Sequence, residues 1–370
     1  MKVRLLHTLA ADGRTSSEVY ATELASALGR LGAADLDLTH YRPRGALRSM
    51  VDRPNIAARV AGYVDHYVGY PLRARAGTAD VHHLIEHGYG HLALCLTPAR
   101  TVVTFHDAML MKLEARELPT AIYPRVSMLA NRPKTHGLQR AARVIAVSQR
   151  SREDLLRFTN CEPAKVSVVY EGVSAAFRPA EEPRGNLGSR PVRILHVGHC
   201  GFYKNIETIL HTIAALSRRL EHPVEFIKAG GAFTRDQQAL IARLRIAEQV
   251  RWLGSVPGDS LPAVYRSADV LLMPSLYEGF GFPALEAMAS GVPVVTSNAG
   301  ALPEVVGDAG LMADPLDVDG YAHAIVRVLT SSELREGMRA RGIARAASFT
   351  WERAAAATLD VYRRVHEEAS

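Results

Sequence analysis

The chain contains few cysteines, and their positions suggest neither a disulfide framework nor a metal site. Only Cys95, Cys161 and Cys200 occur in 370 residues, and their spacing matches no metal-binding pattern. An odd number of scattered cysteines is typical of a protein that works in a reducing compartment. We therefore expect a cytoplasmic protein, with the inner face of the membrane as an alternative place within the cell.

Long apolar runs are also absent. No stretch approaches the ~18 residues that a membrane-spanning helix needs. The first 14 residues carry a short apolar run that His7 interrupts, which a buried first strand explains better than a signal peptide. Repeats of solenoid length and nucleic-acid motifs are missing as well. The formal charge of +6 therefore points to anionic partners other than nucleic acid.

What is present is an alternation of apolar strand-like runs and helical patterns. With 48% apolar and 22% charged residues, a chain of this length can form two α/β domains with separate cores. A stretch at 179–191 rich in Pro, Gly, Glu and Arg is interpreted as a linker. It separates a first domain at 1–178 from a second at 192–350, and a terminal helix is expected within 351–370. The expected strands are residues 3–7, 81–85, 101–105, 143–148, 166–170, 192–197, 224–229, 250–253, 270–273 and 292–295.

The most informative stretch is residues 269–300, which reads as strand, glycine loop, helix and strand. The run Val270–Met273 is apolar throughout, as in a strand buried on both faces of a parallel sheet. Glycines follow it, and Pro283 suits the first turn of a helix. Unsatisfied N–H groups at such a helix start form an anion site that suits phosphate.

Two carboxylates lie beside this expected phosphate site. Glu278 belongs to the loop and Glu286 to the helix, with the seven residues GFGFPAL between them. A carboxylate close to a diphosphate is repulsive unless it accepts hydrogen bonds from hydroxyl groups, such as a ribose diol or a sugar. Taken alone, Glu286 has a simpler explanation, namely that it complements the helix dipole.

The whole string resembles the E-x7-E motif of retaining glycosyltransferases of family 4. That resemblance implies a GT-B fold, in which two Rossmann-like domains face each other across a cleft and a C-terminal helix crosses back to the first domain. It also implies transfer of a sugar, expected to be a hexose, from a nucleotide-diphosphate sugar to an acceptor hydroxyl. The acceptor is a glycan, a lipid-linked sugar or a secondary metabolite, and the oligomeric state is left open.

Other segments carry the same resemblance. In the stretch 198–205, Lys204 matches the basic residue that neutralises the leaving diphosphate, while His199 stands where the family usually has an arginine. The segment TFHD places His106 at a strand end, near the expected donor sugar. The domain exit VVYEGVSAAFRP has Glu171 where the family more often has asparagine. In the first loop, the family usually has two glycines, and only Gly13 is present here.

The resemblance thus assigns two sets of residues. The expected catalytic residues are His106, Lys204 and Glu278. The expected donor-binding residues are Gly13, Gly198, His199, Lys204, Asn205, Ser255, Val256, Glu278, Gly279, Phe280, Gly281 and Glu286. No metal ligands and no cofactor are expected, because the histidines at 82, 83, 87 and 91 fit no metal-binding spacing.

The stretch 41–76 is strongly basic, with seven arginines against two aspartates and with Tyr63, Tyr67 and Tyr70 interleaved. It is either the solvated face of an ordinary helix or a surface for an anionic membrane or acceptor. Pro54, Gly62, Gly69 and Pro71 are expected to interrupt any long amphipathic helix.

Three other functions compete with a transferase. A nucleotide-sugar-binding protein without transfer activity is disfavoured by the joint presence of His106, Lys204, Glu278 and Glu286. A nucleotide-sugar epimerase on the same fold normally lacks this E-x7-E context. A nicotinamide dehydrogenase is weaker still, since no GxGxxG follows the first strand.

Overall fold

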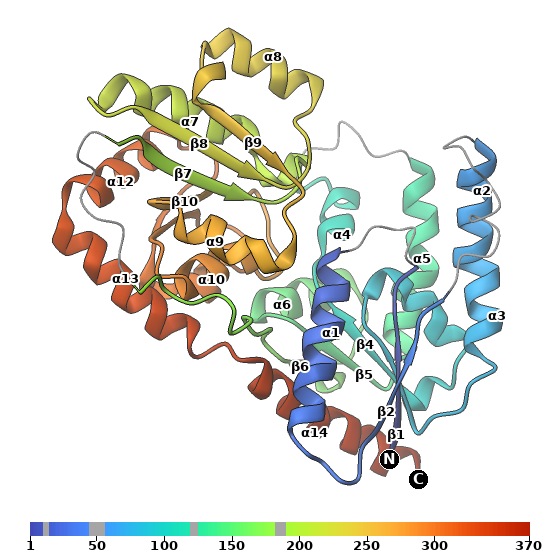
Figure 1. The fold of residues 1–370 in the computed structure, drawn as a ribbon. Helices are drawn as coiled ribbons and strands as arrows, with labels where there is room; N and C mark the ends of the chain where they lie inside the picture. The colour runs from blue at the N-terminus through green and yellow to red at the C-terminus, as the bar shows by residue number, and fades with distance from the viewer. Residues whose placement is uncertain (10–14, 44–55, 119–124, 182–189) are drawn as a thin grey trace. The chain divides into compact units, whose positions relative to one another are not determined.

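The computed structural model describes residues 1–9, 15–43, 56–118, 125–181 and 190–370. They form two compact units (Figure 1), one made of Met1–Gly172 with Trp351–Ser370 and the other of Val173–Thr350. The sequence places the end of the first domain at 178. In the structure Val173 already belongs to the second unit, where its N–H donates to the carbonyl of Phe349 at 3.1 Å. Most of the expected linker, residues 182–189, lies outside the described ranges.

The first unit is built on a six-stranded parallel sheet with strand order β2-β1-β3-β4-β5-β6. The strands are β1 Lys2–Leu6, β2 Asp37–Tyr41, β3 Val81–Leu84, β4 Thr101–Phe105, β5 Arg143–Ala146 and β6 Val166–Val168. Every residue of β4 is buried, as expected for a strand covered on both faces. The order reverses between β1 and β3, and ligands of open α/β sheets bind at such a point, outside the carboxyl ends of the strands.

Helices cover both faces of this sheet (Figure 1). They are α1 Thr15–Arg30, α2 Ile56–Val64, α3 Tyr70–Ala74, α4 Met109–Glu114, α5 Arg125–Arg140, α6 Gln149–Phe158 and α14 Trp351–Ala369. The C-terminal helix α14 packs beside α1 and contacts β3, β4 and β5. The expected return of the terminal helix to the first unit is therefore confirmed.

The second unit repeats the plan with strand order β12-β11-β10-β7-β8-β9, again all parallel. Its strands are β7 Val192–Val197, β8 Val224–Ala229, β9 Val250–Gly254, β10 Val270–Met273, β11 Val294–Ser297 and β12 Leu311–Ala313. Its helices are α7 Ile206–Arg219, α8 Arg235–Leu244, α9 Leu261–Arg266, α10 Phe282–Ala289, α11 Leu302–Val306, α12 Val318–Thr330 and α13 Ser332–Ala346. The switch point lies between β7 and β10, and the α/β prediction is confirmed.

The sequence prediction missed β2 and was wrong about the stretch from 56 to 74. Strand β2 is an edge strand whose residues are partly or fully exposed, so it lacks the apolar run that marks the central strands. The glycines and Pro71 do not interrupt the helical stretch as expected. A π-helical turn at Asp65–Gly69 connects α2 to α3, and Pro71 is the second residue of α3.

Helix α14 is tied to the sheet by one buried hydrogen-bond chain. Both nitrogens of the His83 ring are engaged, since Nδ1 lies 2.6 Å from the Tyr362 hydroxyl and Nε2 lies 2.7 Å from Thr104 Oγ1. Burial lowers the pKa of His83 to about 3, so the ring is neutral. The histidine thus serves packing between α14 and the sheet.

Tyr362→Phe should destabilise the first unit by about 1–3 kcal/mol, because it leaves a nitrogen of the buried His83 ring without its partner. Urea unfolding followed by the fluorescence of Trp351, in a Trp252→Phe background, would measure this loss. Tyr63→Phe is a matched control, since Tyr63 is exposed and should change nothing. Equal unfolding midpoints for Tyr362→Phe and the parent would contradict the proposed anchor.

Candidate active site

The loops that follow β7 and β10 meet at the switch point of the second unit. Lys204 follows β7 and Glu278 follows β10, and Lys204 Nζ donates to Glu278 Oε1 at 2.7 Å. Both side chains are buried. The N–H of Leu276 also donates to the carbonyl of Tyr203 at 2.7 Å, which joins the two loops through the backbone. The structure therefore brings together two of the expected catalytic residues as an ion pair.

Glycines shape the loop around Glu278. Gly281 has a φ of +112° and directly precedes α10, where a Cβ would lie 2.9 Å from Leu302 Cδ2. Gly300 has a φ of +61°, and a Cβ there would lie 2.4 Å from the carbonyl oxygen of Glu278. Only glycine fits these positions. Gly300 thus allows close contact with the backbone of Glu278, a role that the sequence analysis did not assign.

Helix α10 begins beside the ion pair. No side-chain hydrogen bond caps its start within the described chain. The helix dipole makes such an end favourable for an anion. Phe280 is buried, and its ring packs edge-to-face on Phe282 and Phe349. Phe280 therefore fixes the loop from inside, and Gly279 beside it is half-buried.

Glu286 lies one turn inside α10, and its partner is a residue that the sequence analysis missed. The hydroxyl of the fully buried Tyr265 in α9 donates to Glu286 Oε2 at 2.6 Å. Burial raises the pKa of Glu286 to about 7, although the hydrogen bond from Tyr265 favours the charged form. Nothing in the local pattern of α9 marks Tyr265, because its role depends on a contact with a distant helix.

His199 is neutral, and its ring contacts residues of its own loop. The N–H of Gly201 donates to Nδ1 at 2.8 Å, and Nε2 lies 2.5 Å from the hydroxyl of Tyr203. Because Nδ1 accepts a hydrogen bond, the neutral ring carries its hydrogen on Nε2. Burial and the charge of Lys204 both lower the pKa of His199. This position therefore supplies no positive charge to the site.

A second buried lysine organises the glycine loops, and the sequence analysis missed it too. Lys228 lies in β8, fully buried, and its Nζ donates to the carbonyls of Gly198 at 3.0 Å and Gly231 at 2.6 Å. Burial lowers the pKa of Lys228. A lysine inside the apolar run of a central strand is the one sequence signal that could have revealed it.

Other expected donor-binding residues lie elsewhere or act differently. The side-chain amide of Asn205 donates to the carbonyls of Pro274 at 2.9 Å and Pro315 at 2.6 Å, so it connects loops. Ser255 is exposed and Val256 half-buried, and both follow β9, which β7 and β8 separate from β10. Gly13 lies outside the described residues.

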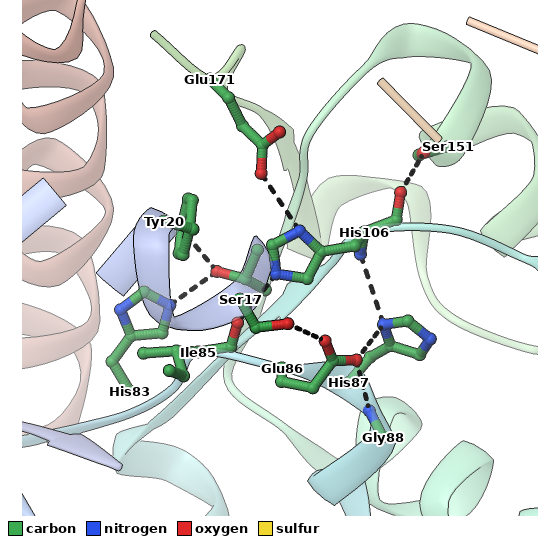
Figure 2. A network of polar contacts seen from close by, with 11 residues as sticks. Ser17, Tyr20, His83, Ile85, Glu86, His87, Gly88, His106, Ser151 and Glu171 are labelled. Atoms are coloured by element: carbon green, nitrogen blue, oxygen red, sulfur yellow. Dashed lines mark hydrogen bonds and ion pairs between the residues drawn. The ribbon is translucent and has the colours of Figure 1, made fainter. Parts of the chain in front are cut away.

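In the first unit, His106 follows β4 at the carboxyl edge of the sheet. Figure 2 shows its ring between two oxygen atoms: Nδ1 lies 3.1 Å from Glu171 Oε1, and Nε2 lies 2.9 Å from the carbonyl of Ile85. Burial alone would lower the pKa of His106. The hydrogen bond with Glu171 and the nearby charge of Glu86 outweigh it and raise the pKa to about 9. Both ring nitrogens are thus occupied inside this unit.

Within the described ranges, no group of three or more His, Cys, Asp or Glu side chains is arranged to hold a metal ion. None of the described helices has the length and apolar character of a membrane span.

Comparisons with known proteins give the family. The family model "Glycosyl transferases group 1" matches residues 177–345, and "Glycosyltransferase Family 4" matches residues 17–177. The O-antigen chain mannosyltransferase B of Escherichia coli is 32% identical over 307 residues, which are 80% of this chain and 78% of that protein. The D-inositol 3-phosphate glycosyltransferase of Streptomyces griseus is 34% identical over 60% of this chain and 53% of its own length.

Solved structures show the fold. The sucrose-phosphate synthase of Thermosynechococcus elongatus has a TM-score of 0.80 at 20% identity and covers 100% of both chains. Anabaena HepE in complex with UDP-glucose has a TM-score of 0.71 at 18% identity over 100% of this chain and 99% of that one. The fold is that of the GT-B glycosyltransferases, as the resemblance implies.

Tyr265→Phe should raise the pKa of Glu286 from about 7 by about one further pH unit, because it removes a hydrogen bond that favours the carboxylate. Carboxyl ¹³C NMR of glutamate-labelled protein would follow the titration, with Glu286→Gln to assign the signal. Tyr321→Phe, another buried tyrosine of the same unit, is the control. An unchanged midpoint in Tyr265→Phe would show that this hydroxyl does not set the charge of Glu286.

Proposed function

Since the chain belongs to the group 1 glycosyltransferases, we propose that it transfers a sugar from a nucleoside-diphosphate sugar to an acceptor hydroxyl, with retention of configuration and without a metal. The observation that carries this proposal is the pairing of Lys204 with Glu278 in the loop that leads into α10. A diphosphate sugar needs a cation and the N–H groups of a helix start for its phosphates. It also needs a carboxylate that accepts hydrogen bonds from its hydroxyl groups, and these two loops offer all three.

The donor lies on the second unit in this proposal. HepE binds UDP-glucose on the same fold, which supports a nucleotide-sugar donor here. The diphosphate takes the place of Glu278 as the partner of Lys204 and accepts hydrogen bonds from the start of α10. Glu278, released from the ion pair, accepts hydrogen bonds from the sugar hydroxyls. Glu286 accepts them from the ribose diol.

Retention follows from the roles of the carboxylates. A double displacement needs a free carboxylate beneath the anomeric carbon. Glu278 and Glu286 already serve hydroxyl groups in this arrangement. The acceptor therefore attacks from the face that the diphosphate leaves, and the departing phosphate takes the acceptor proton. Lys204 and the start of α10 stabilise the charge that develops on the diphosphate, which lowers the barrier without a metal. His106 positions the donor sugar.

The acceptor belongs to the same chemical class as the substrates in the relatives' names. Those names refer to an O-antigen chain and to D-inositol 3-phosphate. Both carry sugar or cyclitol hydroxyl groups, so a glycan, a lipid-linked sugar or a small polyol is the proposed acceptor.

Incubation with nucleoside-diphosphate sugars, UDP-glucose among them, should give slow hydrolysis of one donor and faster transfer with an acceptor. The product should keep the donor's anomeric configuration, as its NMR coupling constant would show. The rate should persist in EDTA. An inverted product would reject same-face attack, and inhibition that added metal reverses would reject metal independence. Calorimetric donor binding without any turnover would identify a binding protein instead.

The matched variants for this assay are Glu286→Gln and Glu248→Gln. The first keeps its shape but loses a charge-assisted hydrogen bond to the ribose, so donor binding should weaken by roughly 1.5–3 kcal/mol. Glu248 is exposed in the same unit and should leave binding unchanged. Because the pKa of Glu286 is about 7, donor affinity of the parent should also fall as the pH drops below about 7.

A second part of the proposal concerns the basic stretch at 41–76. Its described helices expose five large apolar side chains, with Val60 55%, Tyr63 56%, Val64 38%, Val68 50% and Leu72 63% accessible. Exposed apolar residues beside arginines such as Arg75 favour an anionic membrane surface over a plain solvated face. We propose peripheral contact of this helical surface with anionic lipid.

Sedimentation with liposomes should therefore rise with the anionic lipid fraction and fall with salt. Leu72→Glu should weaken it, since Leu72 is the most exposed of the five. Val19→Glu, on the exposed face of α1, is the control. Equal failure to sediment with neutral and anionic vesicles at low salt would reject the membrane and favour a soluble acceptor.

A further inference from the structure

Glu171 is a buried carboxylate in the first unit. It follows β6 at the carboxyl edge of the sheet of the first unit, and its side chain is 1% exposed. A buried carboxylate is costly unless it is paired. Its partner in the structure is His106, with 3.1 Å between Oε1 and Nδ1 (Figure 2).

The two hydrogen-bond partners of the His106 ring bear on whether it is neutral or doubly protonated. Glu171 Oε1 and the carbonyl of Ile85 lie within hydrogen-bond distance of the ring, one at each nitrogen. Burial raises the pKa of Glu171, whereas the hydrogen bond with His106 and the charge of His106 favour the carboxylate. A neutral imidazole has a single N–H and can donate to only one of them. Only the imidazolium donates to both, in agreement with the raised pKa of His106.

The backbone of His106 is held as firmly as the ring. Its N–H donates to His87 Nδ1 at 3.3 Å, and its carbonyl accepts from Ser151 Oγ at 3.0 Å. The ring of Tyr20 stands edge-on at 5.1 Å. The side chain therefore has one orientation in this form, and its Nε2–H points at the carbonyl of Ile85.

Four other titratable side chains face the His106 ring. Glu86 lies in the next loop, where its carboxylate accepts from Ser17 Oγ at 2.5 Å and from the Gly88 N–H at 3.0 Å. The others are His83, His87 and Tyr20, of which His83 is neutral. Glu171 is the carboxylate in direct contact with the ring, so among these groups it favours the doubly protonated form of His106 most strongly.

We propose that Glu171 is a positioning residue for sugar transfer, which keeps His106 doubly protonated so that Nε2 always presents an N–H to an oxygen of the donor sugar. This rests on the proposed function. When the sugar binds, its oxygen replaces the carbonyl of Ile85 as the acceptor. An asparagine at 171 accepts the Nδ1–H without charge, so the imidazole loses its Nε2 proton near neutral pH and meets the sugar as an acceptor.

The first test is a histidine titration that needs no substrate. In ¹³C- or ¹⁵N-histidine NMR, with His106→Ala to assign the signal, His106 of the parent should stay protonated up to about pH 9. In Glu171→Gln, which keeps the shape, its midpoint should fall to about 6.5 or lower. The same midpoint in both proteins would overturn the proposal.

The second test is the pH profile of kcat/KM. The parent should vary little between about pH 6 and pH 8, while Glu171→Gln should lose activity as the pH rises. The loss at pH 8 should reach about 10- to 100-fold, the effect of one charge-assisted hydrogen bond. A shifted NMR midpoint with a profile parallel to that of the parent would also overturn the proposal, because the charge of His106 would then not serve the reaction.

Two further variants separate charge from folding. Glu171→Asp keeps the carboxylate and should keep the parent's pH profile, whereas Glu171→Asn should behave like Glu171→Gln. Glu162→Gln is the surface control, since Glu162 is 70% exposed and pairs with Lys165 at 3.4 Å. If the chain transfers no sugar, the kinetic arm fails for all variants, and the NMR titration alone still tests the ion pair.

Discussion

The ion pair between Lys204 and Glu278 is the contact on which the second unit's site depends. It joins the loops after β7 and β10, the two neighbouring strands from which the chain runs in opposite directions across the sheet. Removing one partner would leave a buried charge without compensation, which costs about 3–5 kcal/mol. The pair thus holds both loops in place and keeps a cation ready for an anion that can displace the carboxylate.

The first unit also pairs a buried carboxylate with a cation, but the cation there is a histidine. His106 lies at the carboxyl edge of its sheet, near Glu171 and Glu86. Its ring is charged because each of its nitrogens faces an oxygen atom, one of Glu171 and one of the Ile85 carbonyl. In both units a buried carboxylate follows a strand at the carboxyl edge of its sheet and pairs with a basic side chain. The bases differ in kind, since Lys204 is cationic by its own chemistry and His106 only through its neighbours.

The strands and the motif could be read from the sequence because their signals are local. The apolar run at β10, the loop glycines and Pro283 all lie within a few residues of one another. The partners of the site residues could not be read in this way. Tyr265 reaches Glu286 from another helix, and Glu171 reaches His106 from 65 positions away. Strand β2 was missed for a related reason, because an exposed edge strand has no apolar run.

Because His199 is neutral, the peptide backbone of the second unit has to contribute more to the stabilisation of a bound anion. An arginine at that position would add a full positive charge, but His199 accepts the N–H of Gly201 and carries none. Lys204 is then the cation paired with Glu278, and a diphosphate would add further negative charge. Peptide N–H groups at a helix start attract an anion without bringing a counter-charge, so they must supply the remaining stabilisation. Their direction depends on the backbone at Gly281, and on Gly300, which supports Glu278. The glycines are therefore as much a part of the proposed phosphate site as Lys204, and their string of positions is also the part of the sequence that predicts the site most directly.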